Sequence, residues 1–74
     1  MSAVTEVSPY ELLATDFDSR AVEYVAETRA AVARSRTYRI AGWHHVAALA
    51  LNTAWHYRRA AVSARETAAL YRAI

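Results

Sequence analysis

Alanine recurs at every seventh residue in the second half of the chain, at Ala47, Ala54, Ala61 and Ala68. A neighbouring column with the same period alternates rings with small side chains: Trp43, Ala50, Tyr57, Ala64 and Tyr71. Seven residues are close to two helical turns, so both columns lie along one side of a helix. Small side chains let a second helix approach closely, and rings fill the gaps between the contacts. The pattern predicts a helix from Trp43 to about Arg72 that packs against another helix.

The composition predicts a single all-α domain over residues 1–74, in which we expect residues 1–7 to be frayed. One glycine and one proline leave little material for the tight turns of a sheet. The absence of cysteine excludes disulfides and thiolate metal sites. The chain has neither a secretory signal nor an apolar run long enough to cross a membrane. We therefore expect a cytoplasmic protein with no membrane partner.

The first helix is expected to begin at Ser8-Pro9-Tyr10-Glu11. Ser8 can cap the amide of Glu11, whose side chain can return to the amide of Ser8, and Pro9 suits the first helical position. Val7 and Leu12 occupy the two positions of a hydrophobic staple. These signals predict a short helix from about Pro9 to Thr15.

A second helix is expected from about Arg20 to Arg36, after a turn at residues 16–19 in which Asp18 or Ser19 provides the cap. A loop at residues 37–42 then leads to the long final helix. The predicted inward stripe of the second helix consists of Val22, Val25, Ala26, Val32 and Ala33. The predicted architecture is therefore a short N-terminal helix and an antiparallel hairpin of two longer helices.

The final helix contains a second start signal at Ser63-Ala64-Arg65-Glu66, which has the form of a capping box. A break there would shorten the helix to match its predicted partner. The alanine column crosses Ser63 without slipping, which favours a continuous or merely kinked helix.

Charge is divided unevenly along the chain. Residues 1–27 contain six acidic residues and one arginine, whereas residues 28–74 contain eight arginines and one acidic residue. This asymmetry indicates either that the two parts face each other or that the basic part meets an acidic partner.

Catalytic and metal-binding functions find little support. His44, His45 and His56 lack the four-residue spacing with which two histidines chelate a metal from a helix. The chain has no cysteine or lysine nucleophile and no glycine-rich phosphate loop. We expect a protein that is not an enzyme, with no cofactor, no metal and no small-molecule substrate.

The main candidate site is a second apolar stripe on the final helix, formed by Leu51, Trp55 and Val62. It lies about 100° around the helix from the Ala54 column and is flanked by Arg58 and Arg59. A hairpin needs only one stripe, and surplus apolar surface with tryptophan and arginine is typical of a partner site. The alternative is that the short first helix covers it through Tyr10, Leu12, Leu13 and Phe17.

The stripe of Leu51, Trp55 and Val62, together with Arg58 and Arg59, predicts a small adaptor or inhibitor that binds a protein partner through this helical face. A core of this size also favours a homodimer or a stable hetero-complex. The alternative is a nucleic-acid-binding protein whose arginines contact phosphates, interleaved with the rings of Tyr38, Trp55 and Tyr57. The arginines of that alternative are Arg34, Arg36, Arg39, Arg58 and Arg59. A chain of this size would also suit an accessory protein of a phage or mobile element.

Overall fold

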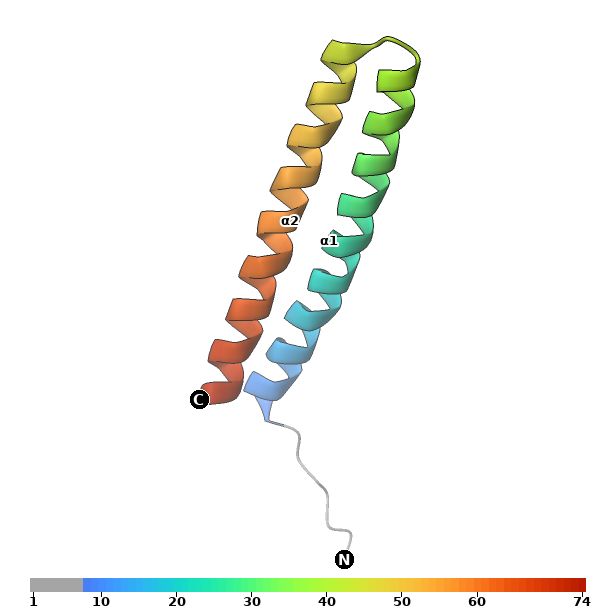
Figure 1. Ribbon diagram of the computed structural model, residues 1–74. Coiled ribbons are helices and arrows are strands. Elements are labelled where there is room, and N and C mark those ends of the chain that lie inside the picture. Colours follow the sequence, from blue (N-terminus) through green and yellow to red (C-terminus); the bar gives the residue numbers. More distant parts are fainter. Residues whose placement is uncertain (1–7) are drawn as a thin grey trace, which may run out of the picture.

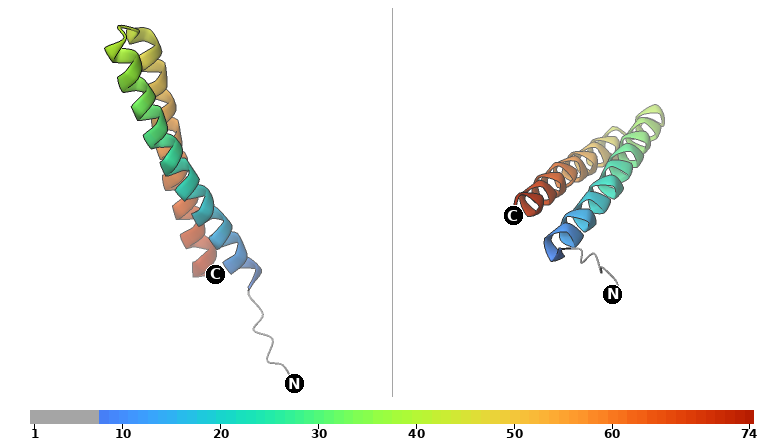
Figure 2. Two further views of the ribbon diagram at one scale, coloured as in Figure 1. Left: turned by 90° about the vertical axis from the view of Figure 1, so that its right-hand side faces the viewer. Right: turned by 90° about the horizontal axis from the view of Figure 1, so that it is seen from below.

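The protein is an all-α hairpin of two long helices that lie antiparallel against each other (Figure 1). The computed structural model describes residues 8–74. Helix α1 spans Pro9–Ile40 and helix α2 spans His44–Ala73. The two helices keep contact along their length, and no third element covers either side of the described part of the chain (Figure 2). The predicted hairpin is confirmed.

The separate short N-terminal helix is a wrong prediction, because α1 runs without interruption through the expected turn at residues 16–19. Asp16 pairs with Arg20 one turn later, at 3.0 Å. Phe17 faces α2 and stacks on Tyr71. None of these turn residues is glycine or proline, so long-range packing outweighs their weak local preference for a cap. The expected loop at residues 37–40 is helical for the same reason.

The predicted start of α1 is correct in position and differs in detail. Ser8 Oγ accepts a hydrogen bond from the amide of Tyr10 at 3.2 Å, and Pro9 is the first helical residue. The carboxylate of Glu11 reaches Arg72 on α2 instead of returning to Ser8. Val7 of the predicted staple lies outside the described residues.

The turn between the helices is closed by a glycine. The amide of Trp43 donates to the carbonyl of Tyr38 at 2.8 Å, and the amide of Gly42 donates to the carbonyl of Arg39 at 3.0 Å. This pair of bonds is a Schellman motif, which places the residue after the helix in the left-handed region. Gly42 has a φ of 83°, and it is the residue type for which that conformation costs least.

The contact between the helices, here called the seam, is made of small side chains and rings. The fully buried residues of the described chain are alanines and one serine: Ala14, Ala21, Ala31, Ser35, Ala47, Ala54, Ala61, Ala64 and Ala68. Ring pairs fill the space between these layers, with centroid distances of 5.8–6.3 Å: Tyr10–Tyr71, Phe17–Tyr71, Tyr24–Tyr57 and Tyr38–Trp43. The predicted contact through the alanine column of α2 is therefore confirmed.

The valine stripe predicted for α1 is wrong. Val22 is 67% exposed, Ala26 and Ala33 are also exposed, and Val25 and Val32 lie at the edge of the seam. The residues of α1 that face α2 repeat every seventh position in two columns: Tyr10, Phe17, Tyr24, Ala31, Tyr38, and Ala14, Ala21, Thr28, Ser35. Side-chain size selects this face, because only small residues and flat rings fit a close helix pair.

Helix α2 is continuous through Ser63, as the alanine register indicates. Ser63 is exposed, and its carbonyl accepts a hydrogen bond from the hydroxyl of Thr67 at 2.9 Å. The expected mismatch in helix length disappears because α1 has 32 residues and α2 has 30.

Candidate partner-binding surface

One long side of the hairpin carries an apolar groove between the two helices, here called the groove face. Two neighbouring hollows follow it, of about 220 Å³ and 350 Å³. Buried Ala54 and Ala61 line the bottom, and the remaining lining residues are Val25, Thr28, Arg29, Val32, Leu51, Trp55, Arg58, Val62 and Arg65. The seam stays shallow here because its residues are small, so the flanking valines and leucine form walls above it.

The predicted apolar stripe of α2 belongs to this face and is open. Leu51 is 41% exposed, Trp55 is 54% exposed and Val62 is 47% exposed. The alternative, in which the start of the chain covers the stripe, is wrong. Tyr10 and Phe17 stack on Tyr71 at the seam instead, and Leu12 and Leu13 stay exposed.

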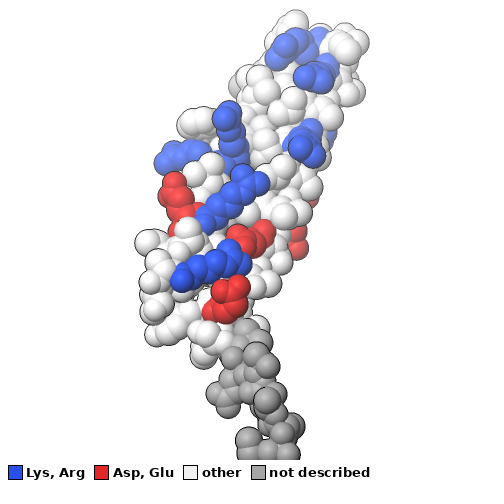
Figure 3. Space-filling model, turned by 60° about the horizontal axis from the view of Figure 1, so that its bottom comes forward, with Lys and Arg blue, Asp and Glu red and all other residues white. Residues whose placement is uncertain are grey.

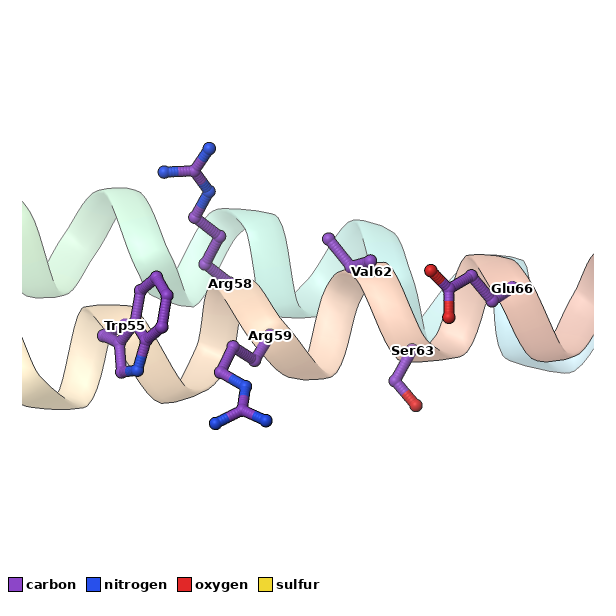
Figure 4. A pocket seen from close by; sticks show the side chains of 6 residues that line it. All are labelled: Trp55, Arg58, Arg59, Val62, Ser63 and Glu66. Atoms are coloured by element: carbon purple, nitrogen blue, oxygen red, sulfur yellow. The ribbon is translucent and has the colours of Figure 1, made fainter.

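The two arginines beside Trp55 point to opposite sides of α2 (Figure 4). Arg58 projects toward α1 and lines both hollows of the groove. Arg59 projects away from α1, with its guanidinium carbon 5.9 Å from the ring centroid of Trp55. Together with Val62, Ser63 and Glu66, these three residues enclose a third hollow of about 460 Å³ on the surface of α2. Arg58 is therefore the member of this pair that lies in the groove.

Ion pairs are concentrated at the open end of the hairpin, where the chain ends lie. Arg72 contacts Asp18 at 2.6 Å and Glu11 at 3.4 Å, which brings the acidic start of α1 against the basic end of α2. The hydrogen bond to Asp18 is the main cause that raises the pKa of the Arg72 guanidinium. The only other ion pair in the described chain is Arg20–Asp16.

The loop end has no acidic residue to balance its arginines. Residues 28–57 contain four arginines and no aspartate or glutamate. In Figure 3 the visible acidic side chains all lie toward the chain ends, whereas arginines extend to the loop end. Within residues 8–74, Arg29, Arg58 and Arg65 of the groove face form no ion pair.

The structure separates the arginines of the nucleic-acid hypothesis. Arg36, Arg39 and Arg58 lie on the side of the hairpin that carries the groove, whereas Arg34 lies on the opposite side, since two residues turn a helix by about 200°. The rings of Tyr38 and Tyr57 stack within the seam on Trp43 and Tyr24. These two rings are therefore engaged within the protein, whereas Trp55, the third ring of that hypothesis, is exposed.

Apart from the alanines at its bottom, five residues of the groove face were not among the predicted site residues: Val25, Thr28, Arg29, Val32 and Arg65. Arg65 belongs to the predicted helix but was not assigned to its partner surface, and the other four lie on α1. The seven-residue columns of α1 contain the missing signal, because they identify its seam and hence the residues beside it.

The three histidines are exposed and do not form a metal site. Among residues 8–74 there is no group of three or more histidine, cysteine, aspartate or glutamate side chains that could hold a metal ion. No helix in the same range is long and apolar enough to span a membrane.

Comparison with protein-family models, with curated proteins and with solved structures finds no match for this chain.

Proposed function

We propose that the protein is a non-catalytic helical adaptor or inhibitor that binds a protein partner through the groove face. The observation that carries this proposal is the open apolar stripe of Leu51, Trp55 and Val62. Complete burial of an exposed large apolar side chain gains about 1.5–3 kcal/mol, so each of these half-exposed side chains would gain roughly half of that when a partner covers it. Tryptophan and arginine are also the residues that most often dominate binding energy.

The composition of the seam supports the proposal. The described chain buries no side chain larger than serine completely, so its large apolar residues are at most partly buried in the isolated hairpin. A partner that covers the groove would provide the apolar burial that the seam lacks.

Affinity capture with variants in matched positions tests the proposal. The wild-type chain, Trp55→Ala and Leu49→Ala would be immobilised and exposed to nuclease-treated lysate of the native host. Leu49 is 54% exposed but lies on the opposite side of α2, so it controls for loss of exposed apolar surface. We expect a protein that the wild type and Leu49→Ala retain and Trp55→Ala loses. In Trp55→Ala the binding free energy of that purified protein should weaken by about 2 kcal/mol or more, as for a truncated hot spot.

Nucleic acid is the competing outcome, favoured by the unbalanced arginines of residues 28–57. In that case the chain captures material from untreated lysate that it no longer captures after nuclease treatment. Binding to a duplex would then fall steeply with salt and depend on Arg36 and Arg39 more than on Trp55. Such a result would contradict the proposed protein partner.

A further inference from the structure

We infer that the groove face receives an amphipathic α-helix with acidic flanks, an inference that rests on the proposed function and specifies its partner. The groove has the form that a third helix needs. It runs parallel to two helices, its bottom is made of alanine, and its walls are Val25 and Val32 on α1 and Leu51 on α2. A helix lying there would complete a three-helix bundle in which the apolar stripe of the ligand covers the seam.

The length of the groove agrees with this occupant. Residues Leu51 to Arg65 span about 21 Å of helix at 1.5 Å per residue. A ligand helix of about four turns would therefore contact both hollows, which are adjacent and share Thr28 and Arg58. Arg58 lies between the two hollows, so an acidic residue near the middle of the ligand could pair with it.

The charge of the groove face specifies the flanks of the ligand. Arg29, Arg58 and Arg65 line the two hollows, and no acidic residue does. Within residues 8–74 these arginines form no ion pair, whereas Arg72 at the open end has two carboxylate partners. Acidic side chains on both edges of the ligand stripe would neutralise them, as charge complementarity across an interface requires.

The same charges oppose a second copy of this chain as the occupant. A twofold contact through the groove face is self-complementary, so it would bring these arginines of one copy close to the same arginines of the other. Like charges brought together at an interface cost several kcal/mol. The acidic residues Glu23 and Glu27 lie on the opposite side of α1. Glu11 and Asp18 do lie on the groove side, in the column of Val25, but both carboxylates are already paired with Arg72 of the same chain.

The experiment uses the full chain with Trp43→Phe, so that Trp55 is the single indole. Three synthetic peptides of about 21 residues, or about 30 Å of helix, serve as probes. The first has a leucine stripe flanked by glutamate, the second has lysine in place of glutamate, and the third has the composition of the first in scrambled order. We expect the glutamate helix to shift the Trp55 emission in a saturable way and to bind at least about tenfold more tightly than either control.

Paired substitutions locate the binding site. Leu51→Asp and Arg58→Glu, both in the groove, should each weaken the glutamate helix by about tenfold or more. The controls Leu49→Asp and Arg34→Glu make the same chemical changes on the opposite side and should leave binding within about twofold. Arg58 is exposed, so the second groove variant keeps the test valid if Leu51→Asp fails to fold by circular dichroism.

Four results would overturn the inference. Equal binding of the glutamate helix and its scrambled form would show attraction by charge alone. Preference for a DNA duplex, or for vesicles of phosphatidylcholine and phosphatidylglycerol, would indicate a different class of ligand. Self-association of the free chain that Leu51→Asp abolishes would identify a second copy. Failure of all three peptides, while a captured protein still depends on Trp55, would refute the acidic helix and leave the proposed protein-binding function intact.

Discussion

The half of the hairpin near the chain ends (the open half) and the half near the turn at Gly42 (the loop half) share the same seam. They differ in their ion pairs and in their aromatic contacts. At the open end, Tyr71 packs between Tyr10 and Phe17, and Arg72 is paired with Glu11 and Asp18. Toward the loop, single alanine layers and one ring pair connect the helices, and four arginines have no acidic neighbour in the sequence from residue 28 to residue 57.

This difference shows how the asymmetric charge of the chain is used. Folding places the acidic start of α1 beside the basic end of α2, so part of the charge is neutralised inside the molecule. The arginines of residues 28–39 face the neutral start of α2 and stay uncompensated. Internal pairing therefore explains the asymmetry at the open end. The surplus toward the loop is the part of the charge that the proposed acidic partner would meet.

The largest expected effect is overpacking of the seam in the loop half. Ala54→Leu should lower the free energy of unfolding by about 1–3 kcal/mol, because a larger side chain that starts from this buried position pushes the two closely packed helices apart. Urea denaturation measures the change, and Ala48→Leu, at an exposed position of the same helix, is the control. Equal stability of the two variants would show that close approach is not what holds this half together.

Ring truncation should destabilise the open half more than the loop half. Tyr71→Ala should cost about 2 kcal/mol, since Tyr71 stacks on two rings and is half-buried. Tyr38→Ala should cost about 1 kcal/mol, since Tyr38 stacks on Trp43 alone. Thermal unfolding of both variants gives the ratio, and a reversed order would contradict the assignment of the aromatic contacts to the open end.

A single hydrogen bond should contribute measurably in the loop half. Ser35 is buried, and its hydroxyl donates to the carbonyl of Ala47 across the seam at 3.0 Å. Ser35→Ala preserves the small size and removes this bond, so we expect a loss of about 1 kcal/mol. Ser63→Ala, exposed on α2, should change stability very little. An unaffected Ser35→Ala variant would mean that size alone selects serine at this layer.

The smallest expected effect is a change in the denaturation midpoint whose sign differs between the two halves when an arginine is replaced. Arg72→Gln should slightly lower the denaturation midpoint at low salt, because it removes two exposed ion pairs. The difference should vanish near 1 M salt, where the Debye length is about 3 Å. Arg36→Gln in the loop half should leave the midpoint unchanged or raise it, since it relieves repulsion among like charges. A matching loss in both variants would show that the arginines toward the loop are also compensated within the fold.

Local patterning was sufficient for α2. Its alanine and ring columns identify the buried face, the continuity through Ser63 and the need for a closely packed partner helix. The same patterning also identifies the open stripe of Leu51, Trp55 and Val62. A contact between two helices buries only one face of each, so apolar residues outside the seam stay exposed.

The break in α1 and its valine stripe were wrong predictions, because they relied on capping signals and on hydrophobicity and not on the seven-residue period of the helix. Asp18 and Ser19 are good caps, and valines are more hydrophobic than alanine, yet the helix continues and the valines stay outside the seam. The same seven-residue columns are present in α1, so its continuity and buried face were available from the sequence.

What the sequence by itself determined is therefore the helical period of both segments, the cap at Ser8 and the close approach that alanine permits. The tertiary structure alone decided which α1 residues oppose which α2 residues, because that register depends on the length of the turn at Gly42. The register places Arg72 on Asp18, Ser35 on Ala47, and Val32 beside Leu51. A groove with arginines from both helices exists only after this pairing, since its walls are more than ten residues apart in the chain.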